Sequence, residues 1–84
     1  MADIKIDATG LRCPLPVLKM EAALRQMTPG QSLELTTDDP LAKLDIPFYA
    51  SKNGHLIKAL ATKGPTTTWL ITCQPSQPPK LDDR

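Results

Sequence analysis

The residue best suited to chemistry in this sequence is Cys13, which lies between Arg12 and the sequence Pro14-Leu15-Pro16. Proline is favoured at the first position of a helix, so Pro14 predicts a helix with Cys13 as its N-cap. Because Pro16 has no N–H, the Leu15 N–H would then be the one backbone donor near the sulfur. The positive end of the helix and Arg12 should both lower the thiol pKa from its free value of ~8.5. We expect a reactive thiolate whose surroundings are shaped by Arg12, Pro14, Leu15 and Pro16.

A single reactive cysteine favours a transfer reaction over redox catalysis. The second cysteine, Cys73, is sixty positions away, so the chain has no Cys-X-X-Cys redox pair. A lone thiolate suits sulfur transfer between proteins, in which it attacks a donor's persulfide, holds the terminal sulfur and gives it to a partner's thiol. Three alternatives remain: a buried Cys13 that only packs at a helix start, a structural disulfide to Cys73, and redox turnover of that pair.

Other polar residues have a structural interpretation beside a chemical one. Cys73 is interpreted as a half-buried side chain at the end of a strand, the alternative being a resolving thiol. Lys19 is either solvated or docks an acidic partner. His55 follows a turn with no second His or Cys nearby, so no metal site is expected. Asp38 and Asp39 precede a proline and are interpreted as a helix cap and its dipole partner.

The first half of the chain predicts a strand, a helix and a second strand. Charged and apolar residues alternate over residues 3–7, as in a half-buried strand. From 14 to 27 the apolar positions recur at three- and four-residue spacing, which predicts an amphipathic helix. Thr28-Pro29-Gly30 ends that helix, and alternation returns over 32–36 as a second strand.

A second helix is expected between Asp38-Asp39-Pro40, which resembles a helix start, and Asn53-Gly54, which resembles a helix stop. Pro47 lies inside this helix and lacks the N–H that its helical hydrogen bond needs. We therefore expect a kink, or a restart with Asp45 as a new cap, and two halves that behave as independent turns.

The remaining ordered residues predict two further strands. Residues 55–63 include several good helix formers, but glycines before and after them leave about nine residues, so a strand is favoured. Residues 66–73 are rich in β-branched side chains and would pair with that strand through a hairpin at Gly64-Pro65. One domain over 1–73 is expected, followed by a proline-rich disordered tail over 74–84.

The element order is therefore βαβαββ, which predicts an α+β two-layer sandwich. Clean alternation in the first two strands indicates that one sheet face is buried and the other is wet. We expect both helices to pack on one face of a four-stranded mixed sheet.

Size and charge limit what the chain can do. Its 84 residues have room for a single two-layer core and for no deep cavity. Ten basic residues are balanced by nine acidic ones, so we expect no direct nucleic-acid binding. No stretch has the pattern of a signal peptide or a membrane span, which predicts a cytoplasmic protein. We expect a monomer that uses no cofactor.

The sequence around Cys13 resembles the TusA-type (SirA-like) sulfur-carrier family, whose signature is a Cys-Pro-X-Pro motif that opens the first helix. The residues that stand at the family's spacing are Asp7, Gly10, Leu11, Arg12, Cys13, Pro14, Pro16 and Val17. Its later landmarks appear as Pro29-Gly30, Asp38-Asp39-Pro40, Asp45-Ile46-Pro47 and Gly54-His55. The resemblance extends from residue 4 to about residue 73.

This resemblance implies a βαβαββ sandwich similar to the C-terminal domain of translation initiation factor three, and a persulfide carried on Cys13. Implied donors are cysteine desulfurases or rhodanese-like proteins, and implied acceptors include relay proteins of the DsrE type. The routes served would be tRNA thiolation, molybdenum-cofactor synthesis or sulfur oxidation. Relatives often carry an acidic residue where this chain has Leu15, and basic residues where it has Cys73-Gln74. These departures bear on the choice of partner.

We therefore predict a sulfurtransferase of a sulfur relay that acts through a persulfide on Cys13. The alternative is a non-catalytic interaction or regulatory module that binds through the open face of the sheet and has no need of the thiol. Exposed beside the sulfur, Leu15 is expected to make an apolar contact with a partner.

Overall fold

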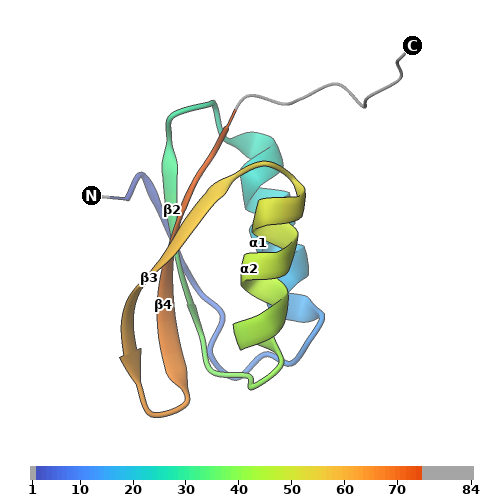
Figure 1. Ribbon diagram of the computed structural model, residues 1–84, viewed down its shortest axis with the longest axis vertical. Coiled ribbons are helices and arrows are strands. Elements are labelled where there is room, and N and C mark those ends of the chain that lie inside the picture. Colours follow the sequence, from blue (N-terminus) through green and yellow to red (C-terminus); the bar gives the residue numbers. More distant parts are fainter. Residues whose placement is uncertain (1, 75–84) are drawn as a thin grey trace.

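Four strands form one mixed sheet, and two helices lie on one of its faces (Figure 1). The computed structural model describes residues 2–74, so all but the first residue of the predicted tail over 74–84 lies outside the described residues. In chain order the elements are β1 (Ile4–Asp7), α1 (Leu15–Gln26), β2 (Ser32–Thr37), α2 (Ala42–Lys52), β3 (Leu56–Lys63) and β4 (Thr66–Thr72). The predicted βαβαββ order and the α+β two-layer sandwich are confirmed.

The strands are ordered β1-β2-β4-β3 across the sheet. β1 and β2 are parallel because α1 crosses over between them, and Ile6 lies beside Leu35. β4 inserts between β2 and β3 and is antiparallel to both, with Ile71 between Leu33 and Ile57. One parallel and two antiparallel pairs make the sheet mixed, as predicted.

The core fills the space between the sheet and the helices. Every second residue of β2 is buried, which leaves Leu33, Leu35 and Thr37 facing the helices. Inward-facing side chains of the sheet pack against the buried side chains of α1. In the sheet these are every second residue of a strand, and in α1 they recur every three or four residues. The buried apolar residues of the core are Ala8, Val17, Met20, Leu24, Met27, Leu33, Leu35, Ala42, Ile46, Ala50, Trp69, Ile71 and Cys73.

α2 differs from the prediction at its start and at Pro47. Leu41 is the N-cap, and its side chain makes no capping hydrogen bond, so neither Asp38 nor Asp39 caps the helix. Pro47 lies inside one continuous helix, and the expected restart at Asp45 does not occur. The missing N–H of a mid-helix proline costs about 3 kcal/mol, but complete burial of Ile46 and Ala50 on the same helix offsets this cost.

The end of α2 and the strand after it agree with the prediction from the sequence. The His55 N–H donates to the Ala50 carbonyl at 2.9 Å and the Gly54 N–H donates to the Ser51 carbonyl at 3.0 Å. This pair of bonds is a Schellman motif, which needs a left-handed residue, and Gly54 supplies it with a φ of 84°. β3 then pairs with β4 along its length, so pairing overrides the helix propensity of this segment.

The topology brings the ends of two strands and the starts of both helices to one end of the molecule. β1 and β2 end there, and both helices begin there, at the bottom of Figure 1. The loop that carries Cys13 therefore lies beside the corner between β2 and α2. Cys73 follows β4 at the opposite end of the sheet.

A buried hydrogen bond inside the core gives a test of this packing. The Trp69 Nε1–H donates to the Thr37 Oγ1 at 3.1 Å, and both side chains are buried. Thr37→Val keeps the shape but leaves the indole N–H without its acceptor, so we expect a loss of about 1–3 kcal/mol in the free energy of unfolding. Urea unfolding followed by Trp69 fluorescence measures it. Thr62→Val, at an exposed position of β3, is the matched control, and equal midpoints for the two variants would contradict the prediction.

Candidate functional site

The segment that leads to Cys13 begins with a turn closed by Asp7. The Asp7 Oδ1 accepts hydrogen bonds from the Thr9 N–H at 3.0 Å and from the Thr9 hydroxyl at 2.6 Å. The two bonds lower the pKa of Asp7 because they stabilise its ionised form. The Ala8 N–H donates to the Thr36 carbonyl at 2.8 Å, so the turn remains attached to β2.

Two carboxylates of the corner between β2 and α2 hold the backbone of the Cys13 loop. The Asp38 Oδ1 accepts the Gly10 N–H at 2.9 Å, and the Asp39 Oδ2 accepts the Cys13 N–H at 3.2 Å. The interpretation of this acidic pair as a helix cap and its dipole partner is therefore wrong. Its carboxylates satisfy N–H groups of a loop that lies 26 to 28 positions earlier in the chain.

α1 begins one residue later than predicted. Pro14 is the N-cap, since its carbonyl accepts the Leu18 N–H at 3.0 Å, and Cys13 precedes it through a cis peptide bond. The Leu15 N–H donates to the Arg12 carbonyl at 2.8 Å and is therefore not the donor to the sulfur that we expected. Cys13 is not the N-cap because a turn over 12–15 comes before the helix.

The Cys13 thiol faces a carboxylate of α2. Its Sγ donates a hydrogen bond to the Asp45 Oδ2 at 2.7 Å. This hydrogen bond, burial of the thiol and the negative charges of Asp45 and Asp39 all raise the thiol pKa. The predicted lowering by the helix end and Arg12 is therefore wrong. A nearby carboxylate stabilises the thiol over the thiolate, and Arg12 is not among the groups that shift the pKa.

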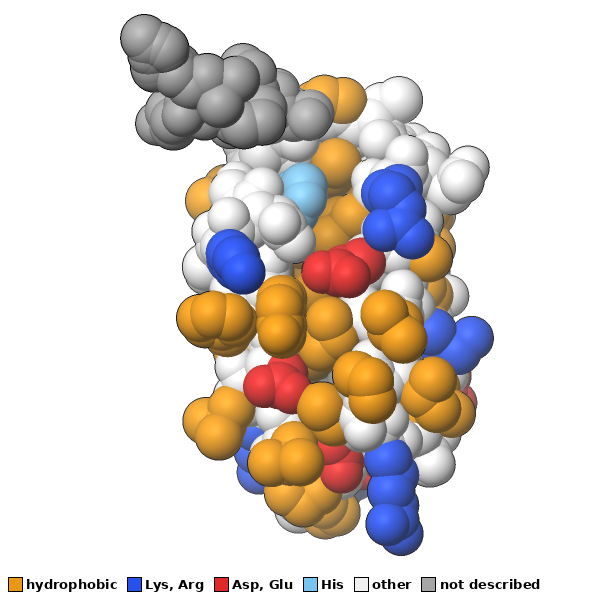
Figure 2. Space-filling model, turned by 90° about the vertical axis from the view of Figure 1, so that its right-hand side faces the viewer, with side chains coloured by type: hydrophobic (Ala, Val, Ile, Leu, Met, Phe, Trp, Pro, Cys, Tyr) orange, Lys and Arg blue, Asp and Glu red, His pale blue; other side chains and the backbone are white. Residues whose placement is uncertain are grey.

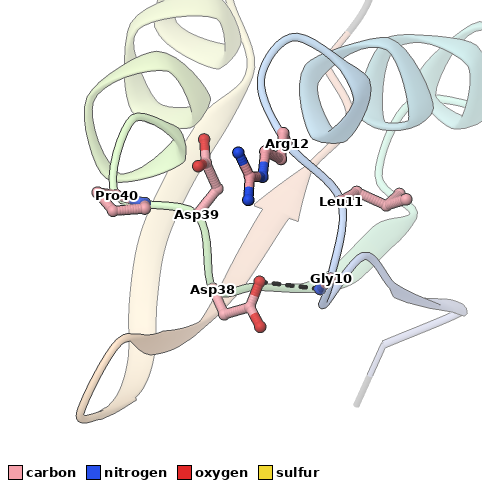
Figure 3. A pocket seen from close by; sticks show the side chains of 6 residues that line it. All are labelled: Gly10, Leu11, Arg12, Asp38, Asp39 and Pro40. Atoms are coloured by element: carbon pink, nitrogen blue, oxygen red, sulfur yellow. Dashed lines mark hydrogen bonds between the residues drawn. The ribbon is translucent and has the colours of Figure 1, made fainter.

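A shallow polar depression of about 410 Å³ lies between the loop that carries Cys13 and the corner between β2 and α2 (Figure 3). Its lining residues are Gly10, Leu11, Arg12, Asp38, Asp39 and Pro40. The exposed Arg12 side chain reaches across the space toward Asp39 (Figure 3). The depression is open, and two of its lining residues, Arg12 and Asp39, are neighbours of Cys13, whose side chain is partly exposed.

The other residues predicted to shape the site lie at the start of α1. Pro16 is fully buried, whereas Pro14 is exposed. Leu15 is 49% exposed, as expected for a residue that meets a partner. Lys19 is exposed one turn further along α1. The proline pair therefore has one member anchored in the core and one at the surface.

Exposed apolar side chains continue from the site across the helix layer. We call Leu15, Leu18, Leu41, Leu44 and Phe48 the helix-face patch. They lie on α1, on α2 and at the N-cap of α2, and all are more than 45% exposed. Figure 2 shows apolar side chains spread over this face between a few acidic ones. Such a surface is typical of an interaction site.

Cys73 occupies a structural position at the far end of α1. It is buried, and its Sγ lies 4.0 Å from the Leu24 carbonyl oxygen and 3.9 Å from the Met27 carbonyl oxygen. α1 has twelve residues and is therefore about 18 Å long. Cys13 precedes the start of that helix, whereas a disulfide needs Cα atoms within about 7 Å. The two thiols cannot pair in this fold, which supports the structural interpretation of Cys73.

His55 supports the end of β4. Its Nδ1 accepts the Gln74 N–H at 3.0 Å, and burial lowers its pKa, so the imidazole is neutral at pH 7. Within residues 2–74, no three His, Cys, Asp or Glu side chains are grouped so that they could hold a metal ion. No helix in that part of the chain is long and apolar enough to cross a membrane.

Asp45 is the site residue that sequence reasoning missed. The buried residues of α2 are Ala42, Ile46 and Ala50, at the spacing of one helix face. Asp45 comes three residues after Ala42 and so borders the same face, where an apolar residue is the usual choice. An acidic residue beside a buried stripe is the signal that the sequence offers for this role, whereas the nearby Pro47 favours its interpretation as a cap.

The fold and the site define a small α+β domain with one accessible thiol at the start of its first helix. A family model described as "Sulfurtransferase TusA" matches residues 4–73. The fold is also that of a crystal structure of a SirA-like protein from Desulfitobacterium hafniense, with a TM-score of 0.75. The two proteins are 23% identical over 86% of this chain and 99% of the other.

The chain belongs to the TusA family. The resemblance inferred from the Cys13 segment is thereby confirmed, and membership supports a role as a sulfur carrier. Proteins of this family typically interact with other proteins of sulfur relays.

The raised pKa of Cys13 predicts its behaviour toward an alkylating reagent. At pH 7 less thiolate is present than in an unstructured cysteine peptide, so iodoacetamide should modify Cys13 more slowly. The rate should continue to rise above pH ~8.5, where the peptide thiol is already half ionised. Intact-mass analysis at a series of pH values measures both rates, and buried Cys73 should stay unmodified in the folded protein. Faster modification of Cys13 than of the peptide at pH 7 would contradict the prediction.

Proposed function

We propose that this protein is a cytoplasmic sulfur carrier that holds sulfane sulfur as a persulfide on Cys13. The donor is a cysteine desulfurase or a rhodanese-like protein, and the acceptor is a protein thiol, such as that of a DsrE-type relay protein. The routes it would serve are tRNA thiolation, molybdenum-cofactor synthesis or sulfur oxidation.

The observation that carries this proposal is an accessible Cys13 thiol with no second cysteine within reach. Cys13 is partly exposed on an open surface, and Cys73 is buried at the other end of α1. A pocket for a small substrate would normally enclose the reacting atoms, whereas here the depression beside the thiol is shallow and open. Membership of the TusA family supports the same conclusion.

Sulfur transfer at this thiol is balanced without an external oxidant or reductant. The Cys13 Sγ bonds to the terminal sulfur of the donor persulfide as the donor's S–S bond breaks. The electron pair of the broken bond stays on the donor's inner sulfur, which takes up the proton lost by Cys13. An acceptor thiol then attacks the terminal sulfur of the Cys13 persulfide and releases Cys13 as a thiol.

Docking of both partners is assigned to the helix-face patch beside Cys13. A donor or acceptor must bring its sulfur to Cys13, so its surface has to cover the start of α1, where Leu15 is half-exposed. Apolar contacts at that point would exclude water from the reacting sulfurs. Lys19, exposed on the same helix, would meet an acidic group at the rim of the contact.

Loading with sulfur tests the proposal directly. Incubation with a rhodanese and thiosulfate, or with a desulfurase and cysteine, should add one sulfur atom, about 32 Da, that a reductant removes. The adduct should be absent from Cys13→Ser and present in Cys73→Ser, since the Cys73 thiol is buried. Intact-mass analysis measures the gain of sulfur in both variants. If the wild-type protein gains no sulfur from any donor, the proposal is wrong and a non-catalytic interaction module is favoured.

The contact made by Leu15 has its own test. Burial of a leucine side chain contributes about 1.5–3 kcal/mol, so Leu15→Glu should slow transfer to at least one acceptor by about tenfold or more. The matched control is Leu60→Glu, which changes an equally exposed leucine on β3. Transfer is measured as loss of the persulfide mass from the carrier over time. Unchanged transfer of Leu15→Glu to every acceptor would refute the contact.

A further inference from the structure

The Cys13 thiol is hydrogen-bonded to a carboxylate on a different element. The Cys13 Sγ and the Asp45 Oδ2 are 2.7 Å apart, although the residues are separated by 32 positions. Asp45 is half-buried, and its neighbour Ile46 is fully buried in the core. Packing of α2 against the sheet therefore holds this carboxylate at the sulfur.

Two further charged groups lie around the thiol. Asp39, from the corner between β2 and α2, accepts the Cys13 N–H at 3.2 Å. Arg12, from the loop itself, reaches toward Asp39 (Figure 3). The negative groups dominate at the sulfur, because Asp45 and Asp39 both raise the pKa of Cys13. In the free protein at neutral pH, the site therefore holds a thiol and not a thiolate.

A protonated thiol has to lose its proton before it can attack a persulfide. The distance from the Cys13 Sγ to the Asp45 Oδ2 is within the range expected between a general base and the group it deprotonates. The next carboxylate, on Asp39, is engaged by the backbone N–H of Cys13. Asp45 is therefore placed to receive the proton.

We propose that Asp45 is a catalytic residue of the sulfur carrier, the general base that takes the Cys13 proton when a donor persulfide is in place. The proposal rests on the carrier function proposed above and adds a step to it. The proton moves from Sγ to the Asp45 carboxylate as the new S–S bond forms. It then passes to the donor's inner sulfur, which leaves with the electron pair of the broken bond. Asp45 ends as a carboxylate, so atoms and charges balance.

The same contact protects the sulfur between transfers. Alkylation and oxidation of cysteine follow the amount of thiolate and its exposure. A surface thiol held in its protonated form by Asp45 reacts more slowly in both reactions. When a donor docks, its persulfide supplies the electrophile, and the thiol proton is transferred to Asp45 as the new S–S bond forms. Protection and activation thus depend on one carboxylate.

The test is Asp45→Asn, which keeps the shape and the ability to accept a hydrogen bond but removes the charge and the basic oxygen. Alkylation of Cys13 by iodoacetamide at pH 7 should become severalfold faster, because the pKa of Cys13 falls when the charge is removed. Sulfur loading from rhodanese with thiosulfate should become slower, by at least about tenfold, because the base is lost. Opposite changes in the two rates are a result that a structural role alone does not produce.

Two further variants complete the experiment. Asp45→Glu restores a carboxylate and should recover part of the loading rate. Glu34→Gln removes a negative charge from β2 on the open face, away from the thiol, and should change neither rate. Thermal unfolding of each variant shows whether the fold is retained.

Each result of these measurements decides the proposal. Sulfur loading that is unchanged or faster in Asp45→Asn would overturn the assignment of Asp45 as general base. It would mean that the carboxylate only lowers the reactivity of the Cys13 thiol. A decrease of both rates in a folded variant would also overturn it, since the thiol would then be mispositioned. Failure of the wild-type protein to accept sulfur from any donor would instead refute the carrier function itself.

Discussion

Three carboxylates of the segment from Asp38 to Asp45 hold the loop that carries Cys13, and the geometry of the site depends on them. Two accept backbone N–H groups of that loop, and the third accepts the thiol. A loop between a strand and a helix would otherwise present its N–H groups to water. Because these acceptors come from the corner between β2 and α2 and from the first turn of α2, the position of the sulfur follows the position of α2.

This arrangement explains how an 84-residue chain can place reactive chemistry without a pocket. The sheet and two helices use their apolar residues for a single core, and the depression beside Cys13 is open. The chemistry is instead at one end of the sandwich, where β1 and β2 end and both helices begin (Figure 1). An exposed apolar helix face beside the sulfur provides the area that a protein partner can cover (Figure 2).

The two cysteines have opposite environments for the same topological reason. Cys13 precedes α1 and lies at the surface, whereas Cys73 packs beneath the C-terminal turn of that helix. The length of α1 keeps them apart, so the fold does not bring the two thiols together. A reactive thiol paired with carboxylates also differs from the common arrangement in which cationic groups or a helix end stabilise a thiolate. Here the resting form is the thiol.

The sequence by itself determined the elements and the family. Alternation in β2 and helical spacing in α1 are local patterns, and they predicted both the sandwich and its buried face. The Cys13-Pro14 segment identified the thiol and its family. Only the tertiary structure decided what Cys13 contacts, because the acceptors of its N–H and of its thiol lie 26 and 32 positions away and are brought to it by the packing of α2. Asp39 and Asp45 were interpreted as caps because capping is a local rule, and the direction of the shift in the Cys13 pKa was consequently predicted with the wrong sign. A pKa depends on which charges are near in space, and no pattern along the chain specifies that distance.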